Sequence, residues 1–130
     1  MIKRAHTRNH AVFWLVLALV AAPLAAAADP ARVVGAEAVR EPGGTWRIAA
    51  TVAHPDEGWD HYADAWRVES ETGEVLGERP LAHPHVDEQP FTRALGGVRL
   101  PEGTTAVILR ARDTQDGWAE ETFRLALPPG

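Results

Sequence analysis

Hydrophobic and polar residues alternate along most of the chain after residue 28, which is the period of half-buried β-strands. The clearest case is 45–54, where every second side chain from Trp46 to Val52 is apolar and His54 continues that face. No stretch beyond residue 28 shows a convincing 3.6-residue helical period. The pattern predicts seven short strands, over residues 32–40, 45–54, 62–69, 75–81, 91–95, 105–113 and 121–127.

Glycine and proline separate these segments at positions where turns and bends belong. Gly73 falls in the turn 71–74, where a hairpin needs a positive φ, and Gly96-Gly97 falls where a bulge or bend would follow the fifth strand. Pro84 and Pro90 keep residues 82–90 out of a central strand, because proline donates no hydrogen bond to a ladder. Short strands with regularly spaced turns predict an all-β fold, a seven-stranded antiparallel sandwich of the immunoglobulin-like kind.

The C-terminal third resembles a fibronectin type III domain. Leu95-Gly96-Gly97-Val98 followed by Pro101-Glu102-Gly103-Thr104 is similar to that family's loop between two strands, and residues 107–113 are similar to its strand before an Asp-Gly turn. The chain departs from that pattern at Thr105, where the family usually has tyrosine. The resemblance implies a sandwich and an interaction module, without catalysis. The segments 59–64 and 83–93 also resemble parts of small uncharacterised exported bacterial proteins.

The first 28 residues have the composition of a secretory signal peptide. Three basic residues precede an apolar run at 11–22, and the alanines at 25–28 supply a cleavage site before Asp29. The apolar run is shorter than the roughly 20 residues that span a bilayer, so we expect membrane contact only through an uncleaved leader. We therefore expect a signal peptide over 1–28, a sandwich domain over 29–130, and a periplasmic or secreted location.

The charge of the mature part bears on its partners. Removal of Lys3, Arg4 and Arg8 with the leader changes the formal net charge from −5 to −8. An acidic surface argues against nucleic acid as a partner, since binding to phosphates relies on basic side chains. Another exported protein or a small ligand is the expected partner. The chain has no Cys, so its core must close by packing alone.

An antiparallel arrangement places alternate loops at the same end of the sandwich. On the predicted strand order, loops 55–61, 82–90 and 113–118 share one end, which is where such domains usually carry function. All four histidines beyond the leader fall in or beside these loops, together with several carboxylates. The residues expected at this end are His54, His61, His83, His85, Asp87, Glu88, Asp113 and Asp116.

One interpretation of this end is a metal site. His83 and His85 lie one residue apart and would present both imidazoles on one side of an extended segment. Such a nitrogen and oxygen set fits Zn²⁺ or Cu²⁺, whereas Cu⁺ prefers Cys and Met, and the chain has no Cys and only one Met. A further histidine and a carboxylate would complete the set, drawn from His54, His61, Asp60, Asp87 and Asp113.

Two other interpretations are open. The same residues would form a structural hydrogen-bond network, since desolvated polar groups at the edge of a core need partners. Alternatively, the loops form a binding face, with Trp59, Tyr62 and Trp118 as aromatic anchors. Trp46 and Trp66 continue apolar strand faces and are predicted to lie in the core.

Enzyme chemistry has little support in the sequence. The chain has no Cys nucleophile and no G-x-S-x-G motif, and Ser70, its only serine, falls beside the turn expected at the opposite end. We therefore expect an exported, non-catalytic binding or accessory module. The alternative is a periplasmic protein that binds Zn²⁺ or Cu²⁺ through the His/Asp cluster.

Overall fold

The computed structural model describes residues 29–129, so the predicted leader over 1–28 and Gly130 lie outside the described residues. Every regular element between 29 and 129 is a strand. The strands are β1 (Arg32–Arg40), β2 (Trp46–Ala53), β3 (Ala63–Glu69), β4 (Val75–Pro80), β5 (Phe91–Val98), β6 (Ala106–Asp113), β7 (Gly117–Trp118) and β8 (Phe123–Ala126).

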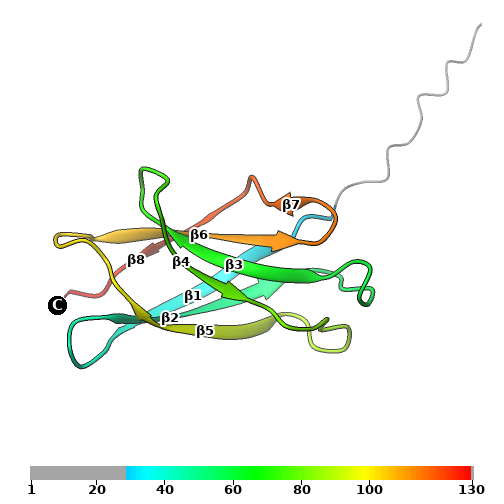
Figure 1. Ribbon diagram of the computed structural model, residues 1–130, viewed down its shortest axis with the longest axis horizontal. Coiled ribbons are helices and arrows are strands. Elements are labelled where there is room, and N and C mark those ends of the chain that lie inside the picture. The colour runs from blue at the N-terminus through cyan, green and yellow to red at the C-terminus, as the bar shows by residue number, and fades with distance from the viewer. Residues whose placement is uncertain (1–28, 130) are drawn as a thin grey trace, which may run out of the picture.

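The strands form two antiparallel sheets that pack face to face as a sandwich (Figure 1). One sheet has the order β1-β2-β5. The other has the order β4-β3-β6-β7, and β8 also pairs with β6. The prediction of an all-β antiparallel sandwich is therefore confirmed, although the structure has eight strands where seven were expected.

The difference in strand count has a simple cause. Strand β7 has only two residues, too few to show any alternation of apolar and polar side chains. The predicted irregularity at Gly96-Gly97 is a bulge inside β5, which runs on to Val98, beyond the expected bound at residue 95. There the register shifts between Trp46 and Ile48 of β2, and Gly97 has a φ of 68°, a conformation that favours glycine.

The core follows the alternation seen in the sequence. Along β2, the side chains from Trp46 to Val52 that share the apolar face are buried. Trp66 of the facing sheet is fully buried, so the prediction that both tryptophans lie in the core is confirmed. Phe91 and Leu109 fill the same cluster from β5 and β6.

One buried charge lies away from this core, at the end of β3. Glu69 is 4% exposed and accepts hydrogen bonds from Arg67 Nε at 2.7 Å and Arg110 Nε at 2.8 Å. Burial alone would raise the pKa of Glu69, but the two guanidinium groups outweigh it and hold that pKa below its usual value. The carboxylate is therefore ionised and joins β3 to β6.

Three loops gather at one end of the sandwich, where β2, β4 and β6 end (Figure 1). We call this the loop end and define it as residues 54–62, 81–90 and 113–117. The turns at 41–45, 70–74 and 99–105 lie at the opposite end. Within residues 29–129, no helix has the length and apolar character that crossing a bilayer requires.

Candidate functional site at the loop end

The loop end concentrates the buried polar groups of the molecule. Among residues 29–129, six polar or charged residues are buried, and five of them lie here. Burial of such groups costs free energy unless they are paired, so their partners indicate what holds this end together. The five are His54, Asp56, His61, His85 and Asp113.

Asp56 connects two of the loops. Its Oδ1 accepts a hydrogen bond from His54 Nδ1 at 2.6 Å and another from the Ala63 backbone N–H at 2.9 Å. Its Oδ2 accepts the His85 backbone N–H at 2.8 Å. Because a carboxylate oxygen can only accept, His54 Nδ1 carries a proton and donates it to Asp56.

Asp113 is held in a similar way at the end of β6. Its side chain is fully buried, and Oδ1 accepts the backbone N–H groups of Gln115 at 2.9 Å and Asp116 at 2.8 Å. The Ala31 N–H lies 3.4 Å from Oδ2. Burial acts to raise the pKa of Asp113, but the three N–H groups and nearby His54 outweigh it, so that pKa lies below its usual value.

His61 completes a compact group with His54 and Asp113. Its Nε2 lies 3.3 Å from Asp113 Oδ1, and its ring meets the His54 ring edge-on with centroids 4.7 Å apart. Despite that short distance, His61 Nε2 has no hydrogen-bond partner among the described residues, and neither has His54 Nε2. One nitrogen from each imidazole and one Asp113 oxygen lie within 4.8 Å of one another.

The His83 and His85 pair lies apart from that group and has other partners. His85 stacks on Phe91 with ring centroids 3.8 Å apart, and its Nε2 is 3.0 Å from Arg93 Nη2. Arg93 can only donate, so His85 Nε2 is the acceptor. Burial and then the Arg93 charge lower the pKa of His85, which keeps this imidazole neutral at pH 7. His83 is exposed, and its Nδ1 lies 3.0 Å from the Pro84 carbonyl oxygen.

The carboxylates of this segment are at the surface. Asp87 is exposed, and so is Glu88, which pairs with Arg93 at 3.4 Å. That arginine lowers the pKa of Glu88. The structure thus divides the predicted metal-ligand set: His54, His61 and Asp113 come together, whereas His83, His85 and Asp87 do not join them.

The three predicted aromatic anchors differ in exposure. Trp59 is 68% exposed, the highest value among the large exposed hydrophobic side chains between residues 29 and 129. Tyr62 contacts its ring edge-on with centroids 5.6 Å apart. Trp118 is half-buried and lies under the guanidinium of Arg67, 4.1 Å from the ring centroid. Trp59 and Tyr62 therefore form one surface feature, and Trp118 packs mainly against arginine.

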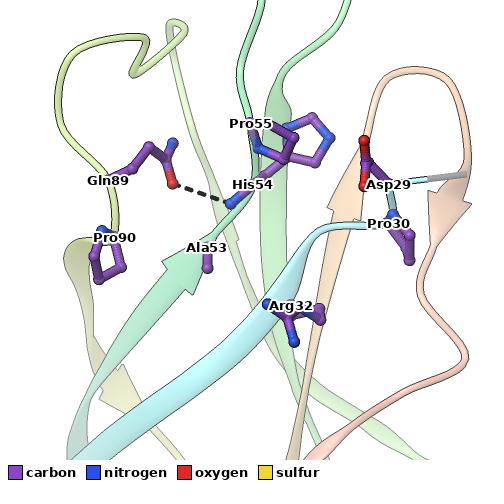
Figure 2. Close-up of a pocket in the computed structure, with 8 residues that line it drawn as sticks. All are labelled: Asp29, Pro30, Arg32, Ala53, His54, Pro55, Gln89 and Pro90. Carbon is purple, nitrogen blue, oxygen red and sulfur yellow. Dashed lines mark hydrogen bonds between the residues drawn. The ribbon is translucent and has the colours of Figure 1, made fainter.

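A pocket of about 440 Å³ borders His54 on the side of β1 and β5 (Figure 2). The Gln89 amide oxygen accepts the His54 backbone N–H at 3.0 Å, as the dashed line in Figure 2 marks. Gln89 also donates from Nε2 to the His85 carbonyl oxygen at 3.0 Å. Gln89 therefore joins loop 81–90 to the end of β2. Nothing in the sequence around Gln89 predicted this role.

The chain is similar to a protein of Halomicrobium mukohataei named "Putative lipoprotein". The two sequences are 41% identical over 76 residues, which are 58% of this chain and 37% of the relative. The chain thus spans little more than a third of the relative's length. No family model and no solved structure matches the chain. The relative's name fits a cell-envelope or exported location.

Proposed function

We propose that this chain is an exported, non-catalytic binding or accessory module that contacts its partner with the loop end of a β-sandwich. The observation that carries the proposal is the exposure of Trp59, at 68%, on a loop that is otherwise fastened to its neighbours. Large aromatic side chains on ordered loops are favoured contact anchors, because they bury much area at little entropic cost.

The loop that carries Trp59 is held on both sides of it. Asp56, three residues earlier, binds the backbone of β3 and of loop 81–90. Tyr62, three residues later, exchanges hydrogen bonds with Thr114 at 3.2 Å and 3.0 Å. The ring of Trp59 is thus presented by a constrained backbone, which supports a role in recognition, since little loop ordering would oppose binding.

The strand order supports an immunoglobulin-like, fibronectin type III-like sandwich. In the immunoglobulin constant arrangement the first, second and fifth strands share one sheet, and the third, sixth and last strands share the other. Strands β1, β2 and β5 pair here in that way, as do β3, β6 and β8. Strand β4 pairs with β3 instead of with β5, so the fourth strand belongs to the second sheet.

An exported location and a protein or small-ligand partner agree with the remaining observations. The leader predicted over 1–28 and the name of the Halomicrobium mukohataei relative both support export, to the periplasm or outside the cell. The net charge of −8 without the leader opposes nucleic-acid binding. Ser70, the chain's only serine, lies in the turn at the end opposite the histidines, which supports a module without a serine nucleophile.

Replacement of Trp59 by alanine tests this proposal. The immobilised mature chain would capture its partner from an envelope extract, and the Kd of the identified partner would be measured for each variant. We expect Trp59→Ala to weaken binding about tenfold or more, the effect of a central aromatic anchor, without lowering Tm. Val39→Ala is the matched control, because Val39 is a hydrophobic residue that is 53% exposed and lies at the end of β1 far from the loop end. Equal binding by the Trp59 and Val39 variants would contradict a loop-end contact.

A further inference from the structure

We propose that His54, His61 and Asp113 form a binding site for one divalent transition-metal ion, Zn²⁺ or Cu²⁺. The inference is independent of the partner contact proposed for Trp59. It starts from two buried imidazoles and a buried carboxylate whose ligand atoms lie within 4.8 Å of one another. His54 is 2% exposed, His61 is 9% exposed and Asp113 is fully buried.

The separations of the three ligand atoms are close to those of an assembled metal site. His61 Nε2 and Asp113 Oδ1 are 3.3 Å apart, and the whole set fits within 4.8 Å. Tetrahedral zinc with bond lengths of about 2.0–2.1 Å places its ligand atoms roughly 3.3–3.4 Å from one another. Binding would therefore need only small inward movements of these side chains.

Hydrogen bonding within the protein does not account for this group. His54 Nδ1 is taken up by Asp56, and His54 Nε2 has no hydrogen-bond partner among the described residues. His61 Nε2 is close to Asp113 but has no hydrogen-bond geometry toward it. An unpartnered buried polar atom costs about 1–3 kcal/mol, and one cation bound through both unprotonated nitrogens would satisfy them together with the carboxylate.

The groups around the three ligands hold them in the form that a metal requires. Asp56 holds the His54 ring through Nδ1 and leaves Nε2 as the nitrogen available to a metal, as carboxylates behind metal-bound histidines do. The backbone N–H groups of Gln115 and Asp116 hold Asp113 through Oδ1, while Oδ2, with the Ala31 N–H at 3.4 Å, keeps a lone pair for a metal. Asp56 is thus a positioning residue for the metal, and not a ligand.

The ligand set selects the ion and indicates a fourth ligand. Two imidazoles and a carboxylate suit Zn²⁺ or Cu²⁺, and a chain without Cys offers no thiolate for Cu⁺. Asp116 Oδ2 lies 4.0 Å from His61 Nε2 with its side chain 31% exposed, so it can close the set from the solvent side. His85 is unsuitable as a ligand, because its Nε2 already accepts from Arg93.

Zinc titration of the metal-free mature chain tests the site. We expect calorimetry to show one Zn²⁺ per chain and an increase in Tm with added Zn²⁺. Asp113→Asn and His61→Gln should weaken binding about 100-fold or more and abolish that increase, since even the loss of a supporting residue costs 10–100-fold. His83→Ala is the matched control, an exposed histidine that should bind zinc like the wild type.

Cobalt provides a second measurement for variants whose fold is perturbed. Co²⁺ added to the wild-type chain should give the intense visible absorption of a four-coordinate site, and Asp116→Ala should weaken that absorption while circular dichroism shows a folded chain. Absence of stoichiometric binding of both Zn²⁺ and Cu²⁺ by the folded wild type would overturn the proposal. Loss of binding in His83→Ala, with Asp113→Asn unaffected, would overturn it as well.

Discussion

Replacing Asp56 by alanine should lower the free energy of unfolding by about 4 kcal/mol, because three buried donors lose their acceptor at once. They are His54 Nδ1–H and the backbone N–H groups of Ala63 and His85. Each orphaned donor costs about 1–3 kcal/mol, and water reaching the new space would offset part of the sum. Since domains of this size are stable by only about 5–15 kcal/mol, the variant should unfold at a clearly lower denaturant concentration.

Urea unfolding in the presence of a chelator measures this effect without any contribution from metal. Asp87→Ala is the matched control, because Asp87 is an exposed aspartate of the same loop end, and its loss should change stability by less than about 0.5 kcal/mol. The stability of Asp56→Asn should fall between those of the two alanine variants. Its amide oxygen can still accept hydrogen bonds, but its NH₂ group cannot accept from the donor that faces it. Equal unfolding midpoints for the Asp56→Ala and Asp87→Ala variants would show that the network does not hold the loops.

Most of the strands were predictable because each buries one face. The period of two along residues 46–52 and 107–111 places the apolar side chains inward, and the structure confirms both segments as strands β2 and β6. The bulge near Gly97 was predictable from a glycine pair inside an alternating segment. Strand β7 was not predictable, because two residues are too few to show an alternation of apolar and polar side chains. It forms through pairing with the end of β6.

The shared end of the histidine loops also followed from strand order, but their grouping did not. The H-x-H spacing puts two side chains on one side only if the segment is extended. In the structure residues 81–90 form no strand, yet the His83 and His85 rings still lie together, with centroids 4.6 Å apart. They do not join His54 and His61, because His85 stacks on Phe91 and accepts from Arg93. The role of Asp56 was missed because its three partners lie on three separate segments that only the fold brings together.

Substitution of Glu69 should give the second largest loss in the free energy of unfolding. Glu69→Gln removes the charge that pairs with Arg67 and Arg110, leaving two guanidinium groups without their carboxylate. We expect a loss of about 2–3 kcal/mol at pH 7, between the values for a charged hydrogen bond and for a fully buried pair. Glu71→Gln is the matched control: its pair with Arg124 is 50–60% exposed and should contribute about 0.5 kcal/mol or less.

The pH dependence of stability distinguishes the charge of Glu69 from its packing. Because the folded pKa of Glu69 lies below its ordinary value of 4.5, the carboxylate contributes its full stabilisation above that value. The contribution is lost as the pH falls through the folded pKa, where Glu69 becomes protonated in both states. The difference in unfolding free energy between wild type and Glu69→Gln should therefore be constant from pH 6 to 8 and should shrink below about pH 4.5. Urea titrations at each pH measure it, and a difference that stays the same at low pH would assign the effect to packing instead.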